Sequence, residues 1–158
     1  MKKIVFLILI SAFFSCKSKK NLGTTETAES YNRFVKVTVD EVIAIKTNRA
    51  YDLGRRLLET CNTSRFKTYT KNEATDKVIK NATVEKITKT CQKMNNRNGK
   101  FIDLQLLEII HDLENDSYQF KYKIVYEKKY FERELNVIVN SDNKVDGIST
   151  KEVPKKAL

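Results

Sequence analysis

The sequence predicts an α+β domain in which helices pack on one face of an antiparallel sheet. Apolar residues recur at helical spacing between about residues 40 and 95. From about residue 101 to residue 150 the spacing changes to two, which is typical of strands with one buried face. A run of helices followed by a run of strands, with short connections, favours the α+β class.

The longest predicted helix spans about residues 40–61. Its apolar face is formed by Ala50, Leu53, Gly54, Leu57, Leu58 and Cys61. Because Gly54 lies on this buried side, we expect another element to approach the helix closely there. Ahead of the helix, residues 35–39 alternate like a strand, and two readings stay open: a strand, or an earlier start of the helix.

Two shorter helices are predicted next. Thr70 and Glu73 have capping-box spacing, which indicates a helix that ends near Lys80. A third helix is expected over about residues 83–95, with Gly99 just past its end.

Four strands are predicted, and the second has the clearest alternation. They cover about residues 102–110, 118–126, 131–139 and 145–150. In the second strand, Gln119, Lys121 and Lys123 form the polar side. Its apolar side consists of Tyr118, Phe120, Tyr122, Ile124 and Tyr126.

Three stretches, "AYDLGRRLLETC", "YQFKYKIVYEKK" and "RELNVIVNSDNKVDGI", carry a resemblance that covers about residues 38–150. A long helix, two shorter helices and a four-stranded meander in this order resemble the cystatin-like α+β roll, the nuclear transport factor 2-like class. The resemblance implies a pocket between the curved sheet and the long helix. Two interpretations of the aromatic side chains stay open: they line such a pocket, or they pack as ordinary core. The residues concerned are Tyr118, Phe120, Tyr122 and Tyr126.

The amino terminus has the layout of a secretory signal peptide. Lys2 and Lys3 precede an apolar run from Ile4 to Phe14, which is too short to span a bilayer. Cleavage before Cys16 resembles bacterial lipoprotein processing, although Phe13 and Phe14 depart from the usual lipobox. The resemblance implies that Cys16 carries a diacylglycerol and acyl chains such as palmitate, which together anchor the chain to a membrane.

The chain is therefore divided into three parts. Residues 1–15 are predicted to be a lipoprotein signal peptide, residues 16–29 a lipidated cysteine with a flexible tether, and residues 30–158 one α+β domain. The tether has no acidic run that would direct the protein to the outer surface. We expect a cell-envelope domain that faces the periplasm.

Two cysteines remain after Cys16 is assigned to the lipid. Cys61 and Cys91 lie on apolar helix faces, in a compartment where disulfides persist. The sequence allows either a disulfide between them or two separate buried thiols. Their spacing, with one histidine in the chain, predicts no metal site.

The formal charge of +10 raises the question of anionic partners. Basic residues alternate with acidic ones, as in "EKKYFERE", so nucleic acid is not expected as a partner. The expected partners are the membrane, through the lipid anchor, and an envelope protein or an anionic envelope polymer. A small-molecule ligand stays open as an alternative.

Catalytic chemistry is not indicated by any motif. His111, the single histidine, is expected at a strand end near a turn, and Asp103 and Glu108 interrupt the first strand of the meander. We find no nucleophile elbow and no phosphate-binding glycine loop, and we expect no cofactor. The favoured function is a non-catalytic accessory or protein-interaction role. The alternative is a small-ligand-binding or sensing module.

Overall fold

The structure, a computed structural model, describes residues 32–154; Cys16 and its tether lie outside these residues. The described part contains five strands and three α-helices. In chain order they are β1 (Phe34–Val37), α1 (Ala44–Thr63), α2 (Asp76–Asn81), α3 (Val84–Asn98), β2 (Phe101–Asp112), β3 (Ser117–Tyr126), β4 (Glu132–Val139) and β5 (Val145–Val153). The predicted α+β class is confirmed.

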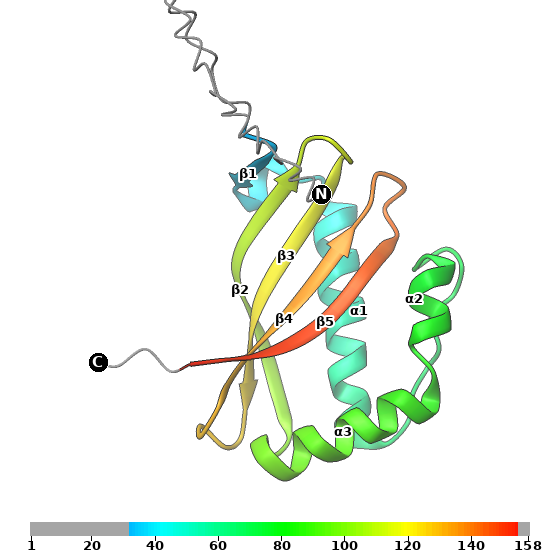
Figure 1. The fold of residues 1–158 in the computed structure, drawn as a ribbon, viewed down its shortest axis with the longest axis vertical. Helices are drawn as coiled ribbons and strands as arrows, with labels where there is room; N and C mark the ends of the chain where they lie inside the picture. Colours follow the sequence, from blue (N-terminus) through cyan, green and yellow to red (C-terminus); the bar gives the residue numbers. More distant parts are fainter. Residues whose placement is uncertain (1–31, 155–158) are drawn as a thin grey trace, which may run out of the picture. The chain divides into compact units, whose positions relative to one another are not determined.

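The five strands form one antiparallel sheet in the order β1-β2-β3-β4-β5. Helix α1 runs along one face of this sheet, and α2 and α3 lie next to it on the β5 side (Figure 1). Two strands therefore border the sheet. The short β1, with the free part of β2, forms one edge, and the full length of β5 forms the other.

The predicted number of four strands is wrong, because residues 34–37 form β1. This strand pairs with the far end of β2, with Phe34 opposite Asp112 and Val37 opposite Ile109. A one-turn 3-10 helix, Val39–Glu41, follows, so α1 begins at Ala44 and not near residue 40. A strand of four residues whose partner lies more than seventy positions away leaves little local signal.

Helix α1 packs directly on the sheet at Gly54, as its place on the apolar face predicts. A Cβ atom at this position would lie 2.6 Å from Cδ2 of Leu135 on β4. The side chains of Val137 and Leu104 are next nearest. The hydrophobic core therefore fills the space between α1 and the centre of the sheet.

Helix α2 begins later than the capping-box spacing predicts. Thr70 and Glu73 do form the expected pair, since the Thr70 amide donates to the Glu73 carboxylate at 2.9 Å. They close a turn, after which the chain is extended through Ala74 and the helix starts at Asp76. Helix α3 runs to Asn98, three residues beyond the predicted end, and Gly99 follows with a φ of 73°.

The outer face of the sheet, opposite the helices, carries a network of cross-strand ion pairs. Glu108 on β2 pairs with Lys121 on β3 and, at 3.7 Å, with Lys36 on β1. Lys123 lies 3.6 Å from Glu132 of β4. On the predicted polar side of β3, neighbouring carboxylates therefore largely neutralise the positive charges of Lys121 and Lys123.

Candidate functional site

A groove of about 300 Å³ separates β5 from the helices α2 and α3. Its floor is apolar and comes from four elements, α1, α2, α3 and β5, together with the residue that follows α2. The floor residues are Leu57, Val78, Ala82, Ile87, Met94 and Ile148. Among these floor residues, Val78, Ile87 and Met94 are buried positions of α2 and α3. The apolar faces of these two helices therefore form one side of the groove, which we call the helical wall.

The opposite wall is the free edge of β5. Five consecutive residues of this strand, 146–150, line the groove. Successive side chains of a strand point to opposite faces, so side chains of one face cannot supply such an unbroken run. The main chain of β5 therefore faces the groove.

The chain itself already pairs with this edge just before the groove begins. Ala74 forms a parallel bridge with Val145, in which the Thr75 amide donates to the Val145 carbonyl oxygen at 3.0 Å. The Val145 amide in turn donates to the Glu73 carbonyl oxygen at 2.9 Å. This end of β5 accepts an added extended segment, and the chain then turns away into α2.

An ion pair lies at each end of the groove. Lys77 of α2 is 3.8 Å from Asp146, where the lined stretch of β5 begins. Arg97 near the end of α3 is 3.1 Å from Glu152, two residues past the lined stretch. The five residues of β5 that line the groove, 146–150, correspond to about 17 Å of strand at about 3.3 Å per residue.

The rim above the apolar floor is mainly polar. Lys77 and Lys86 line it together with Asn81, and Nζ of Lys86 lies 3.4 Å from the Asn81 side-chain oxygen. Asp146 is the one carboxylate in the lining, and it also accepts a hydrogen bond from the Thr75 hydroxyl at 3.0 Å. Two amines against one carboxylate give the rim a small excess of positive charge.

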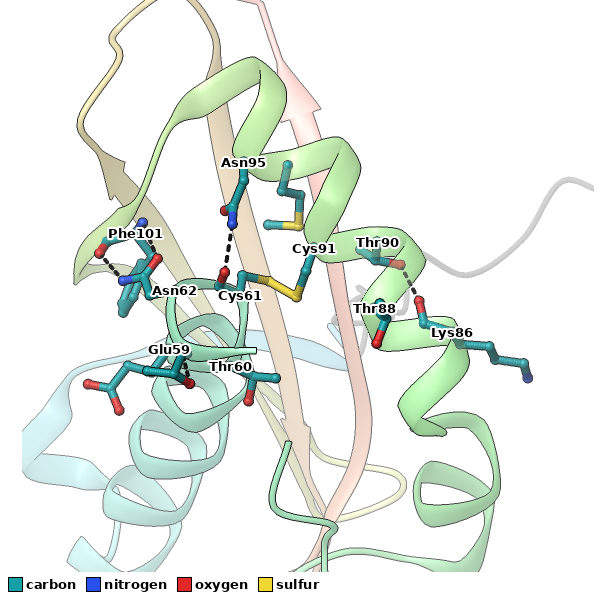
Figure 2. Close-up of a disulfide and its surroundings, with 12 residues drawn as sticks. Glu59, Thr60, Cys61, Asn62, Lys86, Thr88, Thr90, Cys91, Asn95 and Phe101 are labelled. Carbon is teal, nitrogen blue, oxygen red and sulfur yellow. Dashed lines mark hydrogen bonds between the residues drawn. A yellow bond between two sulfur atoms is a disulfide. The ribbon is translucent and has the colours of Figure 1, made fainter. Parts of the chain in front are cut away.

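The sulfur atoms of Cys61 and Cys91 lie 2.10 Å apart, a geometry compatible with the disulfide that the sequence allows. It joins the end of α1 to the middle of α3 (Figure 2). Both residues line the groove on one side and a smaller pocket of about 130 Å³ on the other. The disulfide therefore separates the groove from the smaller pocket.

Thr88 and Thr90 of α3 lie on opposite sides of the disulfide. Thr90 lines the groove, whereas Thr88 lines the smaller pocket. Each is exposed, and each hydroxyl donates to the main-chain oxygen four residues earlier, Thr88 to Val84 and Thr90 to Lys86. Figure 2 shows the pair, which offers matched positions for experiments.

The end of α1 is held by two asparagine side chains. Nδ2 of Asn62 donates to the Phe101 carbonyl oxygen at 2.7 Å, and the Phe101 amide donates to the Asn62 oxygen at 2.9 Å. Asn95 of α3 donates to the Cys61 carbonyl oxygen at 2.6 Å. Asn62 therefore imitates a strand partner at the start of β2 (Figure 2).

The four aromatic residues that the sequence offered as pocket lining lie elsewhere. Phe120, Tyr122 and Tyr126 are buried beneath the helices, and none of the described pockets includes them. Burial raises the pKa of the Tyr126 phenol to about 12. The Tyr122 ring meets Tyr51 of α1 edge to face, with 6.3 Å between ring centroids. In this structure the stripe serves as core.

Tyr118, the fourth of these residues, belongs to a polar cluster at the β2–β3 turn. The His111 ring stacks on it with 4.0 Å between centroids, and the buried Lys46 ammonium lies 4.6 Å from the Tyr118 centroid. Asp116 is 3.0 Å from Nε2 of His111 and 3.9 Å from Nζ of Lys46. The cluster ties the start of α1 to the turn.

The remaining acidic candidates have structural partners. Asp103 accepts a hydrogen bond from the Tyr51 hydroxyl at 3.4 Å, and Glu108 belongs to the ion pairs of the outer face. Within residues 32–154, no group of three or more histidine, cysteine, aspartate or glutamate residues is arranged to hold a metal ion. No helix in that range is long and apolar enough to cross a membrane.

A third hollow is larger but chemically different. It has a volume of about 600 Å³ and is a polar depression along α1, with Asn48, Arg49 and Asp52 in its lining. Binding sites are usually apolar with a few convergent polar groups, which describes the β5 groove better. We therefore take the groove as the candidate site.

The fold and the groove define an α+β domain with an apolar groove along one sheet edge. Comparison with protein-family models, with curated proteins and with solved structures finds no match to this chain.

Proposed function

We propose that the protein is a lipid-anchored protein of the cell envelope with a non-catalytic accessory role, exerted by binding another protein. The domain faces the periplasm, and Cys16 carries the lipid. The observation that supports the binding role is the free main-chain edge of β5, open to an apolar groove along residues 146–150. The geometry of Cys61 and Cys91 supports the location, because disulfides persist in oxidising compartments.

The proposal includes the cystatin-like roll as the fold type. A long helix packed along one face of an antiparallel meander supports it. Function does not follow from such a fold, since related folds carry many unrelated activities. The binding role rests on the groove.

The second candidate function is a small-ligand-binding or sensing module. The space between the sheet and α1 is filled at Gly54 and Tyr122, so the groove is the better place for such a ligand. Its volume of about 300 Å³ lies at the lower end of the range for small-molecule sites, about 300 to 1,000 Å³. A groove with one open main-chain wall suits a polypeptide better.

Anchoring is tested by the mass of the protein purified from its own membranes. A chain that begins at acylated Cys16 supports the proposal, and Cys16→Ser should release the protein into the soluble fraction. A chain that still begins at Met1 would refute the lipid anchor.

Binding is tested by placing a photo-crosslinking amino acid at position 90 or at position 88 in living cells. Both positions are exposed on the same helix, but only position 90 lies in the groove. The proposal expects a defined protein adduct from position 90 that is weak or absent from position 88. Equal adducts from both positions, or none from position 90, would contradict it.

A further inference from the structure

The two edges of the sheet are treated differently. At the first edge, β1 covers only the end of β2, and the rest of β2 is interrupted by bulges near Ile102 and Leu107. Asn62 occupies the main-chain groups of Phe101 there. Bulges and local covering are the usual means by which a sheet edge avoids pairing with another chain.

Apart from a bulge at Asp146, where the register with β4 shifts, the β5 edge carries none of these protections along the groove. From Gly147 to Val153 its register with β4 is unbroken, and the stretch 146–150, "DGIST", contains neither proline nor lysine. A regular strand with unpaired main-chain groups is a template for a further strand. The bridge between Ala74 and Val145 shows that an extended segment fits against this strand.

We propose that the groove takes an extended peptide segment of a partner protein, which adds as a strand to β5 along residues 146–150. This inference rests on the proposed protein-binding role and names its mode. Every second side chain of the added strand points to the helical wall, where Val78, Ala82 and Ile87 lie. The side chains of the added strand that point to this wall are therefore mainly apolar.

The rim indicates the charge of the segment. Side chains of the added strand that point to the helices meet Lys86 at the rim. Lys77 lies at one end of the rim and pairs with Asp146, which also accepts a hydrogen bond from the Thr75 hydroxyl. The chain as a whole has a formal charge of +10. A segment whose helix-facing side chains are apolar, with one acidic side chain among them at the rim, matches both the floor and the rim.

The length of the groove sets the length of the segment. The ion pairs of Lys77 with Asp146 and of Arg97 with Glu152 limit the free edge to the stretch between them. About five residues of added strand fill it.

The test uses the full chain, purified in detergent. The probe is the synthetic hexapeptide Val-Thr-Val-Thr-Glu-Thr with blocked ends, in which the two valines and the glutamate share one face. Two further versions carry N-methyl groups, one on residues 1, 3 and 5 and the other on residues 2, 4 and 6. In a strand, alternate amides point to opposite sides, so only one set donates to β5.

Strand addition expects one methylated version to bind at least tenfold more weakly than the parent peptide and the other to bind nearly as well. The parent should also slow hydrogen exchange of main-chain amides within residues 146–150. If both methylated versions bind like the parent, the peptide is held by side chains alone and strand addition is wrong.

A matched pair of variants locates the bound peptide. Thr90→Trp fills the groove and should weaken binding at least tenfold, whereas Thr88→Trp, on the other side of the disulfide, should leave it unchanged. Thermal unfolding of both variants checks that they are folded. Equal loss in both variants would overturn the placement in the groove.

The outcomes separate this mode from the proposed function itself. A protein adduct at position 90 in cells with no methylation effect leaves the binding role standing and refutes strand addition. Failure of the adduct refutes both. Displacement of the peptide by dodecanoate, with direct binding of that acid in the groove, would assign the groove to a small apolar ligand and overturn the peptide proposal.

Discussion

Gly54 of α1 lies so close to Leu135 of β4 that a methyl group on Gly54 would approach the leucine Cδ2 atom to 2.6 Å. Leu135 is fully buried, and Val137 and Leu104 surround the same point. The contact sets the distance between the long helix and the sheet. It also fills the space in which the resemblance to the cystatin-like roll implies a pocket.

We predict that Gly54→Ala destabilises the protein by about 1 to 3 kcal/mol, the usual range for overpacking. Helix propensity alone acts in the opposite direction, since alanine is better than glycine in a helix by up to about 1 kcal/mol. The steric term should win because the nearest atom belongs to Leu135, whose side chain is fully buried. Chemical denaturation measures the change, and a gain in stability would show that α1 can shift away from the sheet.

Loss of the disulfide between Cys61 and Cys91 should cost about 3 to 4 kcal/mol, because the bond closes a loop with a sequence separation of 30. The double variant Cys61→Ala, Cys91→Ala removes it. Reductant should lower the free energy of unfolding of the wild-type protein by a similar amount. It should not affect the double variant. Equal midpoints for the oxidised wild type and the double variant would contradict this.

Acid should weaken the protein through Glu73. Hydrogen bonds from Arg56, together with the Thr70 amide, lower the pKa of Glu73 to about 2 from an ordinary value near 4.5. A carboxyl whose pKa is depressed by folding stabilises the folded state above its unfolded pKa, so this contribution is lost as the pH falls from about 4.5 to 2.

The variant Glu73→Gln should lose about 1 to 3 kcal/mol at pH 7, the usual worth of hydrogen bonds to a charged group. Its stability should then fall less steeply than that of the wild type between pH 4.5 and 2. Glu85→Gln, which removes an exposed carboxylate paired with Lys89, is the control. If both variants follow the same acid profile as the wild type, Glu73 makes no special contribution.

Tyr122 provides a test of core packing against pocket lining. Its hydroxyl is buried and has no hydrogen-bond partner among the described residues, and burial raises the pKa of the phenol. Tyr122→Phe should therefore change stability by less than about 1 kcal/mol or raise it. Tyr122→Ala should cost about 3 to 5 kcal/mol, as for other large buried aromatic residues.

If Tyr122 instead lined a ligand site, the alanine variant would alter binding more than stability. Denaturation of both variants, with the peptide-binding measurement repeated on each, separates the two cases. Retained stability in the alanine variant would argue against the core assignment.

Helix α1 and strand β3 could be predicted because their signals are local and repeated. Leu53, Leu57 and Leu58 mark the buried face of the helix, and Phe120 and Tyr122 mark that of the strand. Pairing over long sequence distances gave no such signal. The local pattern does not decide between strand and helix at β1, because the partner of β1 is the remote end of β2. It places the start of α2 too early, because Ala74 pairs with Val145.

The groove could not be predicted for a similar reason. The helix over about residues 83–95 and the strand over residues 145–150 are predicted from local patterns, but nothing local shows that β5 borders the sheet. That property depends on the order of all five strands. The alternating aromatic residues of β3 gave a stronger sequence signal, yet Phe120, Tyr122 and Tyr126 belong to the hydrophobic core.

The disulfide between Cys61 and Cys91 affects the order in which the groove can be completed. Its loop contains α2 and the first half of α3, so both cysteines and one wall of the groove precede β5 along the chain. In a chain that leaves the cytoplasm amino terminus first, oxidation can fix the helical wall before residues 146–150 arrive. Strand β5 then packs against a helical wall that is already cross-linked.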